Sequence, residues 1–101
     1  MPTVAVELAE SAIGDIEEIR DWYAAEQVQE VGERLVTEIF DRIESLTTHP
    51  EMGRVVPEFD VDWLRELIHP PFRIVYKRES ERVRIVRVWR SQRLLKLSAE
   101  A

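Results

Sequence analysis

The pattern of apolar and polar positions divides the first half of the chain into three segments. Residues 3–8 alternate between apolar and polar side chains, which predicts a half-buried strand. From about residue 9 or 11 to residue 26, apolar side chains recur every three or four positions, as on one face of a helix. A second stripe of this kind runs from about residue 28 to residue 48 and stops before Pro50. These segments predict a strand followed by an amphipathic helix hairpin.

Three apolar runs follow a loop at residues 50–59. They cover residues 63–68, 72–77 and 82–89, and the turn between the first two contains His69 and two prolines. Short connections between successive strands predict an antiparallel meander. Consecutive prolines belong in the turn because they donate no hydrogen bond to a strand ladder.

The order strand, helix, helix, strand, strand, strand predicts one α+β domain over residues 1–101. A chain of this length can bury one apolar core but not two. We expect a four-stranded antiparallel sheet with both helices on one face, because each helix has one apolar face to cover. The first strand should complete this sheet beside the last strand.

The last strand has an irregular apolar pattern. Val83 and Ile85 share one parity, whereas Val86 and Val88 share the other. Either the strand is buried on both faces, or it contains a β-bulge near Ile85. Both interpretations place it inside the sheet rather than at an exposed edge.

Charge is divided between the two halves of the chain, although the net charge is only −6. Residues 1–64 have a balance of −12, whereas residues 65–96 have a balance of +7. This asymmetry indicates that the basic half meets an anionic partner. The alternative is that acidic helices neutralise a basic sheet within the molecule. We expect Arg82 and Arg84 to pair with helix glutamates in this way.

Composition excludes several classes of protein. The chain has no cysteine, which excludes disulfides and cysteine-based zinc sites and fits a reducing compartment. No apolar run approaches the roughly 20 residues of a membrane span, and the first residues do not resemble a secretion signal. We therefore expect a cytoplasmic protein without membrane contact, and we expect no cofactor and no metal ion.

Several motifs, in their order along the chain, resemble a known protein family. They are AESAIGDIEEIRDWY in the first helix, HPEMGR after the second helix, LRELIHPPFRIVYK in the next two strands, and VRIVRVWRSQRLL at the end. Over about residues 4–95 the chain resembles the toxins of the RelE/ParE superfamily of bacterial type II toxin–antitoxin systems. The resemblance implies the fold of this superfamily. Within it, the chain resembles the ParE-like members more than the RelE-like members.

The resemblance implies one of two activities. RelE-like members cleave messenger RNA in the ribosomal A site, and ParE-like members poison DNA gyrase. Cleavage through the RNA 2′-hydroxyl needs a base, a proton donor and cations around the phosphate. Arg65 and Arg73 match arginines of the family and are candidate phosphate ligands. Glu58 is the candidate base, although a loop glutamate is more commonly solvated.

Two features of the sequence favour the ParE-like activity. No histidine or tyrosine follows Tyr76, so the usual late proton donor is missing, and Arg54 is the only cation of the loop. The acidic first half would also oppose an approach to ribosomal phosphates. We therefore favour a toxin that inhibits DNA gyrase over an enzyme, and an enzyme would be an endoribonuclease that acts on messenger RNA. The first alternative is a ribosome-dependent mRNA interferase, and the second is a non-toxic protein-binding domain.

The basic half of the chain supplies the residues that we expect to bind a target. Arginine stems can cover an apolar sheet surface while their charged groups stay hydrated. The predicted target-binding residues are Arg65, Trp89, Arg90 and Arg93, with Arg73 and Arg87 as further candidates.

Two partners follow from the resemblance. One is a cognate antitoxin, whose acidic segment would fold along the basic surface and give a toxin–antitoxin hetero-oligomer. The other is DNA gyrase or, in the alternative, the ribosome with its messenger RNA.

Overall fold

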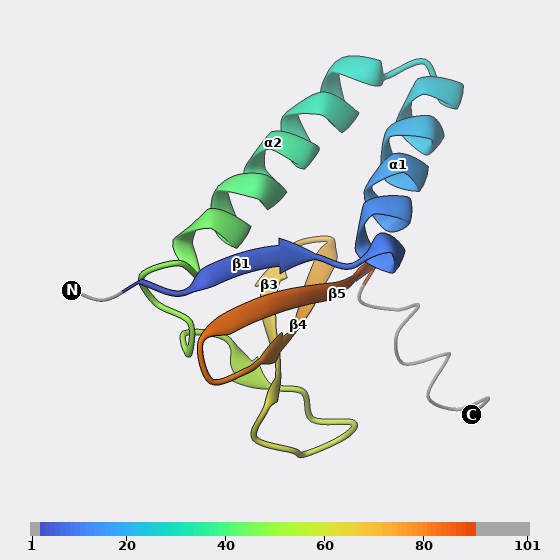
Figure 1. The fold of residues 1–101 in the computed structure, drawn as a ribbon. Helices are drawn as coiled ribbons and strands as arrows, with labels where there is room; N and C mark the ends of the chain where they lie inside the picture. The colour runs from blue at the N-terminus through green and yellow to red at the C-terminus, as the bar shows by residue number, and fades with distance from the viewer. Residues whose placement is uncertain (1–2, 91–101) are drawn as a thin grey trace.

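The computed structural model describes residues 3–90 and confirms the predicted order of elements (Figure 1). The predicted helices and strands all occur, with bounds that differ from the prediction by three residues or fewer. The loop contains one further strand of two residues. The elements are β1 (Ala5–Leu8), α1 (Glu10–Ala25), α2 (Gln29–Ser45), β2 (Arg54–Val55), β3 (Leu64–His69), β4 (Phe72–Arg78) and β5 (Arg82–Arg90).

The sheet is mixed and has five strands in the order β1-β5-β4-β3-β2, which corrects the expected four-stranded antiparallel sheet. β2, β3, β4 and β5 form antiparallel neighbours, as the meander prediction required. β1 lies beside β5 as predicted, but the two strands run parallel. A parallel pair needs a long crossover connection, and the helix hairpin together with the meander provides it.

The turn between β3 and β4 is shorter than the sequence indicated. His69 was expected in this turn but is the last residue of β3, and a cis peptide bond joins Pro70 and Pro71. The ring nitrogen Nε2 of His69 lies 2.9 Å from Oε1 of Glu38 on α2. His69 therefore contacts the helix layer instead of standing in a free turn.

A β-bulge explains the irregular pattern of the last strand. Val75 and Tyr76 are consecutive in β4, yet they pair with Arg87 and Ile85, so that Val86 is the extra residue. The bulge changes the parity of the following residues and keeps Val88 on the helix side of the sheet with Val83 and Ile85. The buried side chains of β5 in this core are Val83, Ile85 and Val88.

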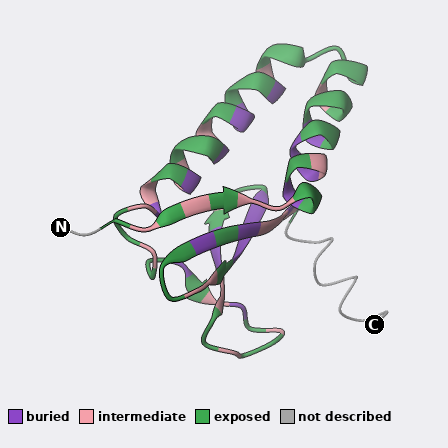
Figure 2. Cartoon of the chain, in the orientation of Figure 1, coloured by how far each residue is buried: buried purple, intermediate pink, exposed green. Residues whose placement is uncertain are grey.

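Both helices cover one face of the sheet, and their buried positions face inward (Figure 2). Burying one large aliphatic side chain contributes roughly 1.5–3 kcal/mol, so this shared core is the main source of stability. No helix within residues 3–90 is long and apolar enough to cross a membrane. The helix residues of the core are Ala12, Ile16, Ile19, Leu35, Val36, Ile39 and Ile43.

The loop after α2 covers part of the other face of the sheet, termed here the loop face. Val56 is fully buried there against Val75 of β4. Leu64, Val86 and Trp89 are partly buried around this pair. The meander therefore lies between the helix layer and the loop, which explains the apolar residues of both parities in β5.

Two helical glycines have opposite surroundings. A Cβ atom added at Gly32 of α2 would lie 2.7 Å from Cβ of Tyr23 on α1, whereas one added at Gly14 would meet nothing within 4 Å. We expect Gly14→Ala to raise the free energy of unfolding by about 0.5–1 kcal/mol, because alanine restricts the unfolded chain more. Gly32→Ala should lower it by about 1–3 kcal/mol through overpacking. Thermal unfolding followed by circular dichroism measures both changes, and equal stabilisation by both substitutions would contradict the close helix contact.

Candidate functional site

A buried network of charges lies on the loop face. Arg73 of β4 is only 4 % exposed. It donates to both carboxylate oxygens of Glu58 at 2.8 Å and to Oε1 of Glu66 at 2.6 Å. Glu66 has a fully buried side chain and also accepts a hydrogen bond of 2.7 Å from Nε of Arg54. These two arginines and two glutamates balance each other and are termed the loop network.

The loop network joins the loop to the sheet, because Arg54 and Glu58 precede β3 while the other two members lie on β3 and β4. Hydrogen bonds from Arg73 lower the pKa of Glu58, and the bonds to Glu58 raise the pKa of Arg73. Both groups therefore stay charged at neutral pH. The Glu58 side chain is 13 % exposed, and it is a poor base because both its oxygens accept hydrogen bonds from Arg73. Arg73 does not fit the role of a phosphate ligand because its donors point at carboxylates.

Arg65 and Tyr76 hold the ends of the same loop. Arg65 donates to the carbonyl oxygens of Asp62 and Gly53 at 3.1 and 3.0 Å, and its side chain is 18 % exposed. The Tyr76 hydroxyl donates to the Pro50 carbonyl at 2.9 Å and accepts from the Gly53 amide at 3.0 Å. Burial raises the pKa of Tyr76. Arg65 thus anchors the loop, which leaves few of its donors for a target.

Arg87 binds a carboxylate that the sequence analysis did not identify. Its guanidinium donates to Asp15 of α1 at 2.8 and 2.7 Å, and Asp15 also accepts the Val88 amide at 2.9 Å. The Ser11 hydroxyl donates to the Val86 carbonyl at 2.6 Å. β1 pairs with β5 only as far as Ile85. After that point, the side chains of Ser11 and Asp15 form hydrogen bonds with the backbone edge of β5. Their spacing of four residues on one helix face is the sequence signal that could have found them.

The other face of Arg87 contacts Trp89. The centre of the Arg87 guanidinium lies 4.2 Å from the centre of the Trp89 ring, which is a cation–π contact. Trp89 is half-buried and belongs to the small apolar cluster of the loop face. Both predicted target-binding residues are therefore involved in internal contacts.

Arg90 is the predicted residue that the structure leaves most accessible. Its guanidinium carbon lies 5.0, 5.3 and 5.9 Å from the ring centres of Trp22, Phe72 and Tyr23. Its Nη2 atom donates to the Tyr23 hydroxyl at 3.3 Å. Arg90 is exposed, and Trp22 is 51 % exposed. These four residues are termed the arginine cradle. Sequence reasoning identified Arg90 but missed the three rings, which come from α1 and β4.

A hollow of about 120 Å³ lies beside the cradle, between α1 and the end of β5. Ile19, Phe72 and Val88 supply apolar side chains to it, and Asp15 and Glu18 also line it. The hollow and the cradle share Trp22, Phe72 and Arg90 and form one surface site. The last predicted target-binding residue, Arg93, lies outside the described residues.

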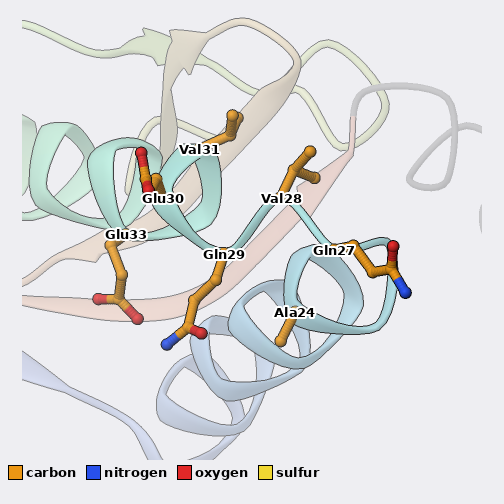
Figure 3. Close-up of a pocket in the computed structure, with 7 residues that line it drawn as sticks. All are labelled: Ala24, Gln27, Val28, Gln29, Glu30, Val31 and Glu33. Carbon is orange, nitrogen blue, oxygen red and sulfur yellow. The ribbon is translucent and has the colours of Figure 1, made fainter.

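A larger open hollow at the tip of the helix hairpin has a different character (Figure 3). Gln27 closes the connection between the helices with a left-handed backbone conformation, at a φ of 62°. Two of the lining residues are glutamates and none is basic. This hollow therefore lacks the charge that an anionic partner requires. Its lining residues are Ala24, Gln27, Val28, Gln29, Glu30, Val31 and Glu33.

No group of three or more histidine, cysteine, aspartate or glutamate side chains between residues 3 and 90 is arranged to hold a metal ion. The loop network and the arginine cradle offer arginine, carboxylate and aromatic groups. Arginine stays protonated in proteins and serves for binding and charge stabilisation rather than proton transfer.

Comparisons with known proteins give a consistent result. The sequence model of the family described as "ParE toxin of type II toxin-antitoxin system, parDE" matches residues 6–95. A search of curated proteins finds no significant match. A chain of the chromosomal ParDE system from P. aeruginosa shares the fold at 21 % identity and a TM-score of 0.74, covering 87 % of this chain and 96 % of that chain. A chain of the toxin–antitoxin complex RelBE2 from Mycobacterium tuberculosis does so at 14 % identity and a TM-score of 0.65, covering 87 % and 98 %.

The loop network predicts a pH-dependent effect of Glu58→Gln. At pH 7 the free energy of unfolding should fall by about 1.5–3 kcal/mol, the contribution of a hydrogen bond to a charged group. The folded pKa of Glu58 lies below its ordinary value of 4.5. The wild-type advantage should therefore be complete above pH 4.5 and disappear as the pH falls through the folded pKa. Urea unfolding at pH 7 and pH 3.5 measures the difference.

The control for this measurement is Glu81→Gln, because Glu81 is an exposed carboxylate of the turn before β5. This substitution should change stability by less than about 0.5 kcal/mol at either pH. A Glu58→Gln deficit that is small at pH 7, or that does not shrink at pH 3.5, would contradict the role given to the Glu58–Arg73 pair.

Proposed function

Because the chain belongs to the ParE toxin family of type II toxin–antitoxin systems, we propose that it inhibits growth by acting on DNA gyrase. The family match covers residues 6–95 and makes the chain the toxin component of such a system. DNA gyrase as the target is a narrower claim than membership of the family. It follows the ParE-like activity that the sequence resemblance implied, and the pairing of the candidate ribonuclease residues supports it.

The candidate ribonuclease residues are already bound by groups of the protein itself. Glu58 and Arg73 hold each other in the loop network, and Arg65 holds the loop through backbone carbonyls. A ribonuclease would need a base and cations directed at an open site. This occupied state of all three residues is the observation that favours gyrase over messenger RNA.

The arginine cradle is an exposed site that is better suited to a protein surface than to catalysis. The arginine cradle combines one exposed guanidinium with aromatic rings, and residues of these types dominate binding at protein interfaces. We therefore propose Arg90 as the main target-binding residue, with Trp89 and Arg93 as further candidates. Arg65, Arg73 and Arg87 bind groups within the chain and therefore rank behind Arg90 as target-binding candidates.

We also propose that a cognate antitoxin neutralises the protein by forming a hetero-oligomer with it. Two solved structures of similar fold are described as a ParDE toxin–antitoxin system and a RelBE2 toxin–antitoxin complex, which supports a partner of this kind. An acidic antitoxin segment would complement the basic second half of the chain, and added salt should weaken their association.

The choice of target has a direct test. The purified protein should inhibit supercoiling by DNA gyrase and should not cleave messenger RNA on translating ribosomes. Arg90→Ala should weaken gyrase inhibition at least about tenfold, because truncating an exposed arginine anchor costs more than 1.4 kcal/mol. Inhibition curves for wild type and variant measure the effect, and thermal unfolding shows whether the variant is folded.

Arg84→Ala is the matched control, because it removes an exposed arginine from the same strand. It should change inhibition by no more than about twofold, as expected for a peripheral charge. If the protein cleaves messenger RNA in the ribosomal A site at an enzymatic rate and leaves gyrase unaffected, the target is messenger RNA and not gyrase. The protein can also be expressed in bacteria with and without the neighbouring gene. If growth is not slowed in either case, a non-toxic binding domain is favoured.

A further inference from the structure

We propose that the arginine cradle and the hollow beside it receive an acidic residue of the antitoxin together with an adjacent apolar residue. The carboxylate would bind Arg90, and the apolar side chain would enter the hollow between α1 and β5. This inference rests on the proposed function, because it names the subsite through which the antitoxin is held.

The guanidinium of Arg90 is prepared for a carboxylate. Three aromatic rings lie within 5.0 to 5.9 Å of its central carbon, and they restrict the side chain before any partner arrives. Among the described residues, its hydrogen bond is the one to the Tyr23 hydroxyl. A guanidinium has five N–H donors, so a pair of donors is left for a two-point bond to a carboxylate. Little side-chain entropy is then lost on binding.

The hollow fits an apolar side chain next to that carboxylate. Its volume of about 120 Å³ approaches the roughly 150 Å³ of a cavity that holds one benzene molecule. Ile19, Phe72 and Val88 form its apolar wall. Trp22 stands at its rim with 51 % of its surface exposed, and a bound segment would cover this ring. Burial of apolar area would therefore add to the charge pairing.

The charges around the site favour one carboxylate over a nucleic acid. Asp15 is already neutralised by Arg87, so it does not oppose an anion. Glu18 is exposed on α1 and lines the hollow. A phosphate backbone places negative charges at short, regular intervals, so a charge next to the one on Arg90 would meet this carboxylate. A peptide with a single acidic residue beside an apolar one can place its charge on Arg90 alone.

The test uses the full-length antitoxin encoded next to the toxin gene as the probe. Its dissociation constant is measured by calorimetry with wild type, Arg90→Ala, Arg90→Lys and Arg84→Ala. We expect a loss of at least about tenfold for both Arg90 variants, because lysine keeps the charge but lacks the planar pair of donors. Arg84→Ala should lose no more than about twofold, since it removes the same charge outside the site.

Trp22→Ala provides a second variant that leaves the core intact, because this ring is half exposed. It should also weaken binding at least about tenfold, as truncation of a covered aromatic anchor does. Trp22→Phe keeps an apolar ring and should recover most of the affinity. Circular dichroism of each variant confirms that the fold is retained.

Several results would overturn the subsite. They are equal losses for Arg90→Ala and Arg84→Ala, full affinity in Arg90→Lys, and unchanged affinity in Trp22→Ala. Weaker binding of gyrase or of an RNA oligonucleotide in Arg90→Ala, with antitoxin affinity unchanged, would assign the site to another partner and also overturn it. Failure of the wild type to bind the antitoxin would instead contradict the proposed function, so the two failures are distinguishable.

Discussion

A buried arginine is stable only when its charge is matched, and the arrangement of the loop face depends on this constraint at Arg73. The low polarity of the interior makes an unpaired charge far more costly than a paired one. Glu58 and Glu66 supply the matching charges, and Arg54 completes the balance at Glu66. Two of these four residues belong to the loop, so the loop is held over the sheet where Val56 is buried.

The same pairing determines which cations are available to other molecules. The basic half of the sequence suggested a broad basic face, but much of its charge is used internally. Arg82 pairs with Glu7 and Glu79 rather than with a helix glutamate. Arg90 differs because its nearest described groups are aromatic rings, which favour a cation without neutralising it. Its charge is therefore still available to a partner.

Helix α1 connects the edge of the sheet with the arginine cradle. Asp15 and Trp22 are seven residues apart and lie on one face of the helix, since seven residues make two turns. The bonds from Asp15 to Arg87 and to the Val88 amide place this face against the end of β5. Trp22 is thereby brought beside Arg90, two residues after Val88. The contact of Asp15 with the edge of β5 thus also positions Trp22 in the arginine cradle.

The sequence by itself determined the two helices, the four longer strands, their order and the family, because these depend on spacings and motifs within short segments. It left the bulge in the last strand as one of two explanations and did not indicate β2. It also identified Arg90 as a candidate. Only the tertiary structure decided the parallel pairing of β1, the burial of Arg73 and the rings around Arg90. These features join residues far apart in the chain: Asp15 and Arg87 are 72 positions apart, and Tyr23 and Arg90 are 67 apart. Local periodicity carries no information about such contacts, because packing and charge matching select them when the layers come together.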